Sequence, residues 1–445
     1  MTYLDIKGKY PEFIYDKYEI IEDDDSFKIT YYFEIVNLKK FTPSLIINKK
    51  DITNENINKD FLNDLVFHLG LVELVSYWKC AMPHKVIIKC GYLNEKQIKW
   101  FKKLYYYGLG EFFYQNNIDI SIDDFMDIDC LGNKTDYSVN YEGKGNLIPI
   151  GGGKDSLVTL SLLKDYYEDN TAFVINPKKA HLDSIKVTDY EDKKIFVTRN
   201  LDKGIMELNK EGFLNGHTPF SAMVSFTSLL IAYLTGKKYI ILSNENSANE
   251  ANVEGTNVNH QYSKSYEYEC DFNNYVNDYF KVDIQYFSLL RGLSELQIAM
   301  LFARHEEYFK AFKSCNVGSK DENWNWCCSC AKCLFVYIIL SPFLSKEQLI
   351  DIFGEDLFAK EELLDIFLEL TGHSDHKPFE CVGTYEEINY AISRVIEKGG
   401  DLPYLLDYYQ KHFPLTKESD LLKRYSDENN IPSEFDKVVR GEINE

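Results

Sequence analysis

The strongest hydrophobic pattern in the chain is an apolar run at residues 147–150, followed by three glycines and then by apolar residues at helical spacing. The run predicts a buried strand, and residues 157–163 predict a helix. The first backbone N–H groups of a helix lack partners within it, and the helix dipole adds positive charge at the same end. Glycines at the turn let the backbone approach an oxyanion closely, so this stretch predicts an anion-binding site.

Strands and helices alternate after this stretch, which predicts a parallel sheet with helices on both faces. Further strands are expected at 172–175, 195–198 and 239–242. A helix is expected at 219–235, because Pro219 favours a first turn and Gly236 follows the apolar run. Such sheets bind ligands beyond the carboxyl ends of their strands. The polar segments expected at that edge are the glycine loop, residues 215–218 and residues 243–264.

The two flanks have different patterns, which divide the chain into three predicted domains. Residues 1 to about 50 are rich in β-branched and aromatic residues and predict strands. Apolar stripes predict helices at 58–80 and 94–115, with a short strand at 85–89, and residues 120–142 are polar and acidic, as in a linker. The predicted domains are an N-terminal α+β domain at 1–140, an α/β domain at 141–345 and a helical region at 346–445.

Charge limits what the chain binds. Its 445 residues carry 49 basic and 70 acidic side chains, which gives a net charge of −21. This argues against a general nucleic-acid or membrane-surface binder, which needs a cationic surface. The N-terminus lacks an apolar signal core and no apolar run is long enough to span a membrane, so a soluble cytoplasmic protein is expected.

Four of the ten cysteines have the spacing C-x11-C-x2-C-x2-C. They are Cys315, Cys327, Cys330 and Cys333. Two-residue gaps let neighbouring thiolates converge on one ion, and four protein ligands suit a closed, structural zinc site. An iron–sulfur cluster is the alternative, because it also takes four cysteines.

Two other segments carry polar groups of possible chemical use. Residues 285–304 place Arg291 and Glu295 four apart, which predicts either a salt bridge on a surface helix or an arginine that binds phosphate or carboxylate. Residues 372–383 group two histidines, a lysine, a carboxylate and the thiol of Cys381 in a predicted loop. Loop histidines are more often solvated than catalytic, so this second segment alone predicts little.

The glycine loop resembles a known nucleotide-binding loop. It is not a Walker loop, because Asp155 follows Lys154 and residue 148 is Ile. It resembles the SGGxDS loop of the ATP pyrophosphatases (PP-loop proteins), with Gly151 in place of the first serine. Those enzymes cleave ATP between the α and β phosphates and adenylate a substrate oxygen.

The chain as a whole resembles the UDP-N-acetylmuramoyl-L-alanyl-L-glutamate epimerases of peptidoglycan synthesis. The resemblance lies in short stretches at 68–70, 76–79, 108–112, 149–156, 215–217, 247–250, 258–265, 290–295 and 376–383, together with the cysteine spacing. It implies a PP-loop fold, an ATP-dependent inversion of the terminal L-glutamate through an adenylated carboxylate, Mg²⁺ beside the ATP, and a UDP-muramoyl dipeptide as substrate.

The resemblance also implies roles for individual residues. Gly151, Gly152, Gly153 and Ser156 would hold ATP phosphates, Lys154 would add positive charge, and Asp155 would help to hold Mg²⁺. His260, Tyr262 and Lys264 are the candidates for the substrate carboxylate and for proton transfer, followed by His217, Glu250 and, near ATP, Arg291.

Two other functions fit parts of the same pattern. The loop and the cysteine spacing also look like 7-cyano-7-deazaguanine synthase, so an amide- or nitrile-forming ligase is the alternative enzyme. A zinc-knuckle binding protein without catalytic activity is the other, although the acidic charge disfavours a nucleic-acid partner.

Overall fold

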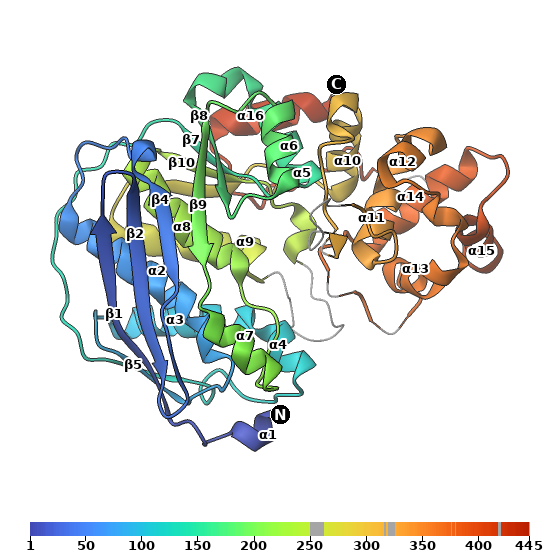
Figure 1. Ribbon diagram of the computed structural model, residues 1–445. Helices are drawn as coiled ribbons and strands as arrows, with labels where there is room; N and C mark the ends of the chain where they lie inside the picture. Colours follow the sequence, from blue (N-terminus) through green and yellow to red (C-terminus); the bar gives the residue numbers. More distant parts are fainter. Residues whose placement is uncertain are drawn as a thin grey trace.

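The computed structural model describes residues 1–249, 262–315, 317–318, 325–374, 376–378, 380–416 and 420–444 (Figure 1). His260 and Glu250, two of the predicted catalytic residues, lie outside these ranges. The described residues form one mixed α/β structure around a large, mostly parallel sheet, with many helices.

Eleven strands of the described chain join in this sheet, in the order β11-β10-β7-β8-β9-β4-β2-β1-β5-β6, with β3 paired to β2. The strands are β1 (Glu12–Glu22), β2 (Ser26–Ile35), β3 (Lys39–Phe41), β4 (Ser44–Asn48), β5 (Lys85–Ile88), β6 (Asp127–Cys130), β7 (Asn146–Pro149), β8 (Asn170–Ile175), β9 (Lys194–Asn200), β10 (Tyr239–Leu242) and β11 (Gln285–Ser288).

The helices lie between and after these strands. They are α1 (Tyr3–Ile6), α2 (Lys59–Trp78), α3 (Glu95–Gly108), α4 (Gly110–Gln115), α5 (Lys154–Leu162), α6 (Lys179–Val187), α7 (Lys203–Lys210), α8 (Phe220–Thr235), α9 (Tyr266–Tyr275), α10 (Glu295–Ala303), α11 (Ala331–Leu340), α12 (Lys346–Phe353), α13 (Leu364–Thr371), α14 (Tyr385–Glu397), α15 (Tyr404–His412) and α16 (Ser433–Asn444).

The predicted parallel sheet is confirmed for the five strands from β7 to β11. Strands β8 and β9 follow β7 on one side, whereas β10 and β11 lie on its other side, and all of these pairs are parallel. The direction of winding therefore reverses between β7 and β10. Open α/β sheets bind ligands beyond the carboxyl ends of the strands at such a switch point.

Neighbouring residues of these strands belong to two different cores, one on each face of the sheet. Leu147 packs into one core and Ile148 into the other, and Ile240 and Ile241 divide in the same way. This follows from the alternation of side chains along a strand. Helices α2, α3, α8 and α9 contribute to the first core, whereas α5, α10 and α11 contribute to the second.

The polar segment at 120–142 is not wholly a linker, and this prediction was wrong in part. Its residues Asp127–Cys130 form β6, which pairs in parallel with β5 at the edge of the sheet. The sheet also continues from the N-terminal strands to the central ones, because β4 pairs with β9. The two domain boundaries, at 140 and 345, stay a prediction.

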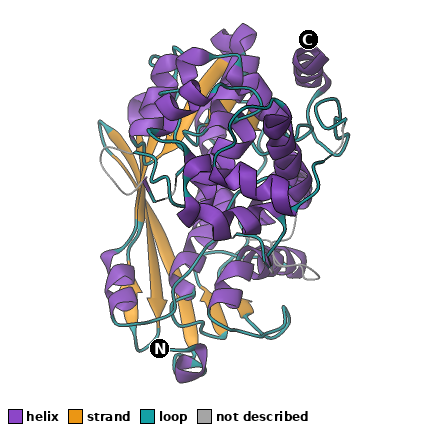
Figure 2. Cartoon of the chain, turned by 90° about the vertical axis from the view of Figure 1, so that its right-hand side faces the viewer, coloured by secondary structure: helices purple, strands orange, loops and turns teal. Residues whose placement is uncertain are grey.

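The C-terminal part is helical, as predicted. Helices α11 to α15 form a group beside the sheet, on the right in Figure 1 and towards the viewer in Figure 2. Helix α11 packs on α10 and α14, so this group is joined to the central sheet through α10. Among the described residues, no helix has the length and apolar character that a membrane span requires.

Candidate active site

A cavity of about 380 Å³ lies at the switch point of the sheet, where the loops after β7 and β10 meet. The glycine loop, the residues after β10 and a loop of the C-terminal region all contribute to its wall. Its charged or titratable lining residues are Asp155, His181, Glu245, Lys264, Glu295, Lys313, Lys332 and Cys381. Two of the three predicted polar segments therefore meet here, through Asp155 and Glu245.

Four of the six residues of the predicted ATP loop line the cavity: Gly151, Gly153, Asp155 and Ser156. Gly151 is exposed, and a Cβ atom there would meet no other atom within 4 Å. Gly153 is the N-cap of α5, and among the described residues no side chain caps this helix. The free N–H groups and the dipole of α5 therefore favour an anion at this wall.

Gly152 lies behind the cavity, where the loop packs against the start of α6. Its φ of +76° is in the left-handed region, and a Cβ atom there would lie 3.1 Å from the Cβ of Ala180. An L side chain in this conformation costs roughly 1–2 kcal/mol. This position therefore requires glycine both for its backbone and for its packing.

We expect Gly152→Ala to lower the free energy of unfolding by about 1–2 kcal/mol and to impair any reaction at the loop. Gly399→Ala is the matched control, because Gly399 has a φ of +75° with nothing within 4 Å of an added Cβ. Chemical denaturation of both variants measures the stability cost. Equal loss of ligand binding in both variants would contradict a special role of the loop.

Lys154 is buried beneath the cavity rather than in its wall. Its ammonium donates to the carboxylates of Asp155 and Glu295, and the Lys154 and Glu295 side chains are both only 1% exposed. Burial raises the pKa of Glu295 against the opposing effect of Lys154, and the two carboxylates raise the pKa of Lys154 against its burial. Lys154 therefore fixes two carboxylates at the floor of the site.

The structure does not have the first of the two arrangements expected for Arg291, a salt bridge with Glu295 on a surface helix. Arg291 lies in the turn between β11 and α10, and Glu295 is the first residue of α10. The Arg291 side chain is fully buried and donates to the carbonyl oxygens of Glu245 and Lys264, at 2.8 and 2.5 Å, and to the Glu269 carboxylate at 3.3 Å. The guanidinium thus ties together two segments that line the cavity.

The other predicted catalytic residues occupy different places. Lys264 lines the cavity, whereas Tyr262 is buried against Tyr107, with ring centroids 5.3 Å apart. His217 precedes α8, and its Nδ1 lies 3.7 Å from a carboxylate oxygen of Glu111. Neither Tyr262 nor His217 lines the cavity formed by the described residues.

Sequence reasoning missed the part that Cys381, Lys332 and Lys313 play in the wall. Cys381 lies in the loop between α13 and α14, and its sulfur accepts a hydrogen bond of 3.1 Å from Nζ of Lys264. Lys332 donates to the Cys381 carbonyl. The signal for Cys381 was the polar loop at 372–383, and the lysines lie one or two residues from the cysteine cluster.

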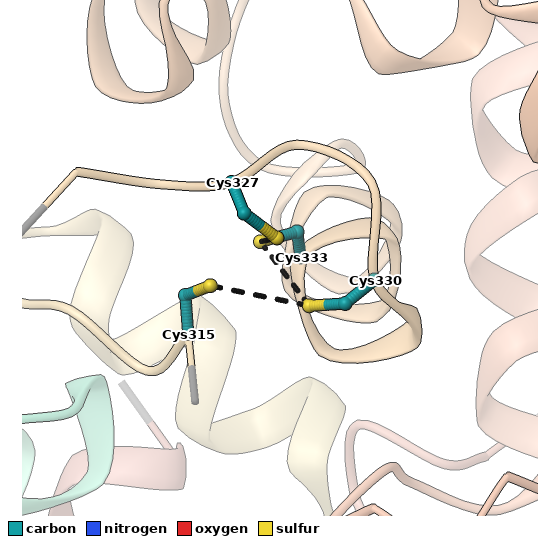
Figure 3. Close-up of side chains that lie close together, drawn as sticks. All are labelled: Cys315, Cys327, Cys330 and Cys333. Atoms are coloured by element: carbon teal, nitrogen blue, oxygen red, sulfur yellow. Dashed lines mark hydrogen bonds between the residues drawn. The ribbon is translucent and has the colours of Figure 1, made fainter. Parts of the chain in front are cut away.

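The four predicted metal-binding cysteines converge. Figure 3 shows their sulfur atoms pointing toward one another, and all four lie within 4.8 Å of one another. The closest pairs are 3.6–4.0 Å apart, which matches the roughly 3.8 Å between sulfurs of a tetrahedral site with Zn–S bonds of about 2.3 Å. The Gly318 N–H also donates to the Cys315 sulfur at 3.1 Å. This arrangement could hold a metal and suits structural zinc.

The cluster also fixes part of the cavity wall, because Lys313 and Lys332 are near neighbours of Cys315 and Cys333 in the chain. We expect Cys330→Ser to lose the metal, to lower the melting temperature and to weaken anion binding. Cys328→Ser is the control, because the Cys328 sulfur points to the Phe353 carbonyl, 3.3 Å away. Elemental analysis that finds equal metal in the wild type and in Cys330→Ser would contradict the site.

The fold and the site define an α/β protein with a glycine-loop cavity at the switch point of its sheet and a four-cysteine cluster beside it. Models of the MurL N-terminal domain and the MurL C-terminal domain match residues 5–289 and 311–402, respectively. The chain belongs to the MurL family.

Three relatives carry the name UDP-N-acetyl-alpha-D-muramoyl-L-alanyl-L-glutamate epimerase. The protein from Salinispora tropica is 34% identical over 336 residues, which are 75% of this chain and 73% of the relative. The protein from a Micromonospora species is 34% identical over 334 residues, 74% of each chain. The protein from Xanthomonas oryzae is 34% identical over 332 residues, 73% of each chain.

Proposed function

We propose that this protein is an ATP-dependent epimerase that inverts the terminal L-glutamate of UDP-N-acetylmuramoyl-L-alanyl-L-glutamate to D-glutamate. The observation that carries the proposal is the match to both MurL domains, together with three relatives named for this activity. The cavity supports it, because an anion-favouring loop and a set of acid–base groups share one wall.

The chemistry explains why ATP is needed. The Cα–H of glutamate beside an ionised carboxylate is a very weak acid, because the carbanion would lie next to a negative charge. Transfer of AMP from ATP to that carboxylate forms an acyl adenylate, in which the carbonyl next to Cα no longer carries the carboxylate charge, and releases pyrophosphate. Loss of the Cα proton then gives an enolate, whose charge fixed donors can stabilise. Return of a proton to the other face, followed by hydrolysis, gives D-glutamate and AMP.

The loop residues would hold the phosphates. The backbone N–H groups at Gly151 and Gly153 would be the donors of this wall, and the Ser156 hydroxyl, which donates to the Gly153 carbonyl at 3.1 Å, would turn to join them. Lys313 adds positive charge beside the loop, because its backbone N–H donates to the Gly152 carbonyl at 2.9 Å. Asp155 and Glu245 both line the cavity, and carboxylates are preferred ligands of Mg²⁺, so these two residues would hold it. Bound Mg²⁺ would neutralise phosphate charge.

Arg291 would act as a positioning residue. Its guanidinium binds the backbone carbonyls of Glu245 and of Lys264. It therefore fixes the position of the proposed magnesium ligand relative to that of a predicted catalytic lysine. Tyr262, His217, His260 and Glu250 stay candidates for binding the substrate carboxylate and for proton transfer.

The test is to incubate the purified protein with UDP-N-acetylmuramoyl-L-alanyl-L-glutamate, ATP and Mg²⁺ and to measure AMP, pyrophosphate and the configuration of glutamate after acid hydrolysis. Epimerisation predicts D-glutamate together with AMP and pyrophosphate. The alternative ligase would instead need ammonia, would form an amide or nitrile and would leave L-glutamate unchanged. A product that contains nitrogen from ammonia and no D-glutamate would therefore contradict the epimerase.

A further inference from the structure

Epimerisation needs groups that can remove and return a proton at Cα, and the thiol of Cys381 is placed for this. We propose that Cys381, held by Lys264, is the acid–base residue that faces one side of the substrate Cα. The inference rests on the proposed epimerase function and names one of its catalytic residues.

The position of Cys381 is set from two sides. Its sulfur accepts a 3.1 Å hydrogen bond from Nζ of Lys264, and its carbonyl accepts one from Nζ of Lys332. All three residues line the cavity that also contains the glycine loop. The C-terminal helical region thereby places a thiol in the same space in which the central sheet would bind ATP and the carboxylate that it activates.

Lys264 suits the role of partner better than that of base. The neighbouring Cys381 and, less strongly, Glu245 raise the pKa of Lys264 despite its burial, so its amine stays protonated at neutral pH. Its backbone is fixed as well, because Arg291 donates to the Lys264 carbonyl. The Lys264 ammonium is thus fixed in hydrogen-bond contact with the sulfur that would exchange a proton with the substrate.

The carboxylates of the wall are already engaged. Asp155 and Glu295 both accept hydrogen bonds from Lys154 at the floor of the cavity. Glu245 is a proposed ligand of Mg²⁺, and its backbone is bound to Arg291. The ring of His181, which also lines the cavity, accepts a hydrogen bond from the Lys178 N–H at 2.9 Å. Cys381 differs from these groups in that its cationic partner, Lys264, is itself part of the cavity wall.

The Cys381 thiolate takes the Cα proton of the adenylated glutamate, so that an S–H bond forms as the C–H bond breaks. The electron pair of that bond moves toward the acyl oxygen and gives the enolate. A second group on the opposite face then gives a proton to Cα. For the other epimer the roles reverse, and the Cys381 thiol becomes the donor.

The experiment separates adenylation from proton transfer in Cys381→Ala and Cys381→Ser. Exchange of labelled pyrophosphate into ATP reports adenylation, and uptake of solvent deuterium at Cα is measured with the L-epimer and the D-epimer separately. Cys270→Ala is the control, because Cys270 is half-buried and lies outside the cavity wall. Wild-type enzyme that makes no adenylate would overturn the proposed function itself, before any variant is compared.

We expect both Cys381 variants to adenylate both epimers at near wild-type rates and to lose roughly 10²–10⁴-fold in epimerisation. Deuterium uptake should persist for the epimer whose Cα–H faces the second group and disappear for the other. Normal epimerisation in Cys381→Ala would overturn the proposal. So would parallel loss of adenylation and exchange, which indicates a structural role, or loss of exchange from both epimers, which indicates a single group serving both faces.

Discussion

Replacing Lys154 with methionine should lower the free energy of unfolding by about 3–5 kcal/mol, because it leaves two carboxylates at a buried site without their counter-ion. The Lys154 ammonium is 1% exposed and bonds both Asp155 and Glu295, and Glu295 is equally buried. Chemical denaturation monitored by fluorescence measures the loss. The double variant Lys154→Met/Glu295→Gln removes one carboxylate charge as well and should recover a large part of it.

The loss should also depend on pH. Burial raises the pKa of Glu295 in the folded protein, so the folded state binds this proton more readily than the unfolded chain does. Protonation then stabilises the fold at low pH, and this stability is lost as the pH rises above the ordinary glutamate value of about 4.3. The loss of unfolding free energy in Lys154→Met, relative to the wild type, should therefore be smallest near pH 5 and larger at pH 8. A loss of unfolding free energy that is independent of pH, or no recovery of stability by Glu295→Gln, would contradict the role of Lys154 as counter-ion of the buried Glu295 carboxylate.

Asp155→Asn should reduce pyrophosphate release by at least roughly 10³-fold, an effect of about 4 kcal/mol on the barrier. Asp155 lines the cavity at the first turn of α5, where a carboxylate can hold a divalent ion beside the phosphates. Asparagine keeps the shape and one acceptor oxygen but removes the charge that a hard cation prefers. Coupled detection of pyrophosphate with saturating ATP and Mg²⁺ measures the rate.

Stability must be followed in the same variant, because Asp155 also accepts a hydrogen bond from Lys154. Asp165→Asn is the matched control, since Asp165 is exposed and lies just after the end of the same helix. Undiminished pyrophosphate release by a folded Asp155→Asn protein would contradict a role of the glycine loop in ATP cleavage.

The fold was predictable where short apolar runs carried a clear period. The runs at 172–175 and 239–242 became β8 and β10, and Gly236 ends α8 with a left-handed φ of +69°. Strand β6 was missed because two of its four residues, Asp127–Cys130, are aspartates, and charged residues are common in edge strands. The start of α10 was within reach of the sequence, since Ser294 and Gln297 form a capping box.

The site was less predictable, because its key contacts join residues that are far apart in the chain. The cysteine spacing alone indicated that four thiols would converge. In contrast, nothing local to Lys154 points to Glu295, 141 residues away, and nothing local to Lys264 points to Cys381, 117 residues away. Such pairs depend on where the strand ends meet in the folded protein.

The proposed function requires that cleavage of ATP between the α and β phosphates make the Cα–H of the substrate acidic. The most direct measurement is deuterium uptake at Cα in D₂O with three nucleotides: ATP, an analogue with a methylene group between the α and β phosphates, and one with a methylene group between the β and γ phosphates. We predict uptake with ATP and with the β,γ analogue and none with the α,β analogue. Equal uptake with the α,β analogue, or without any nucleotide, would contradict the account.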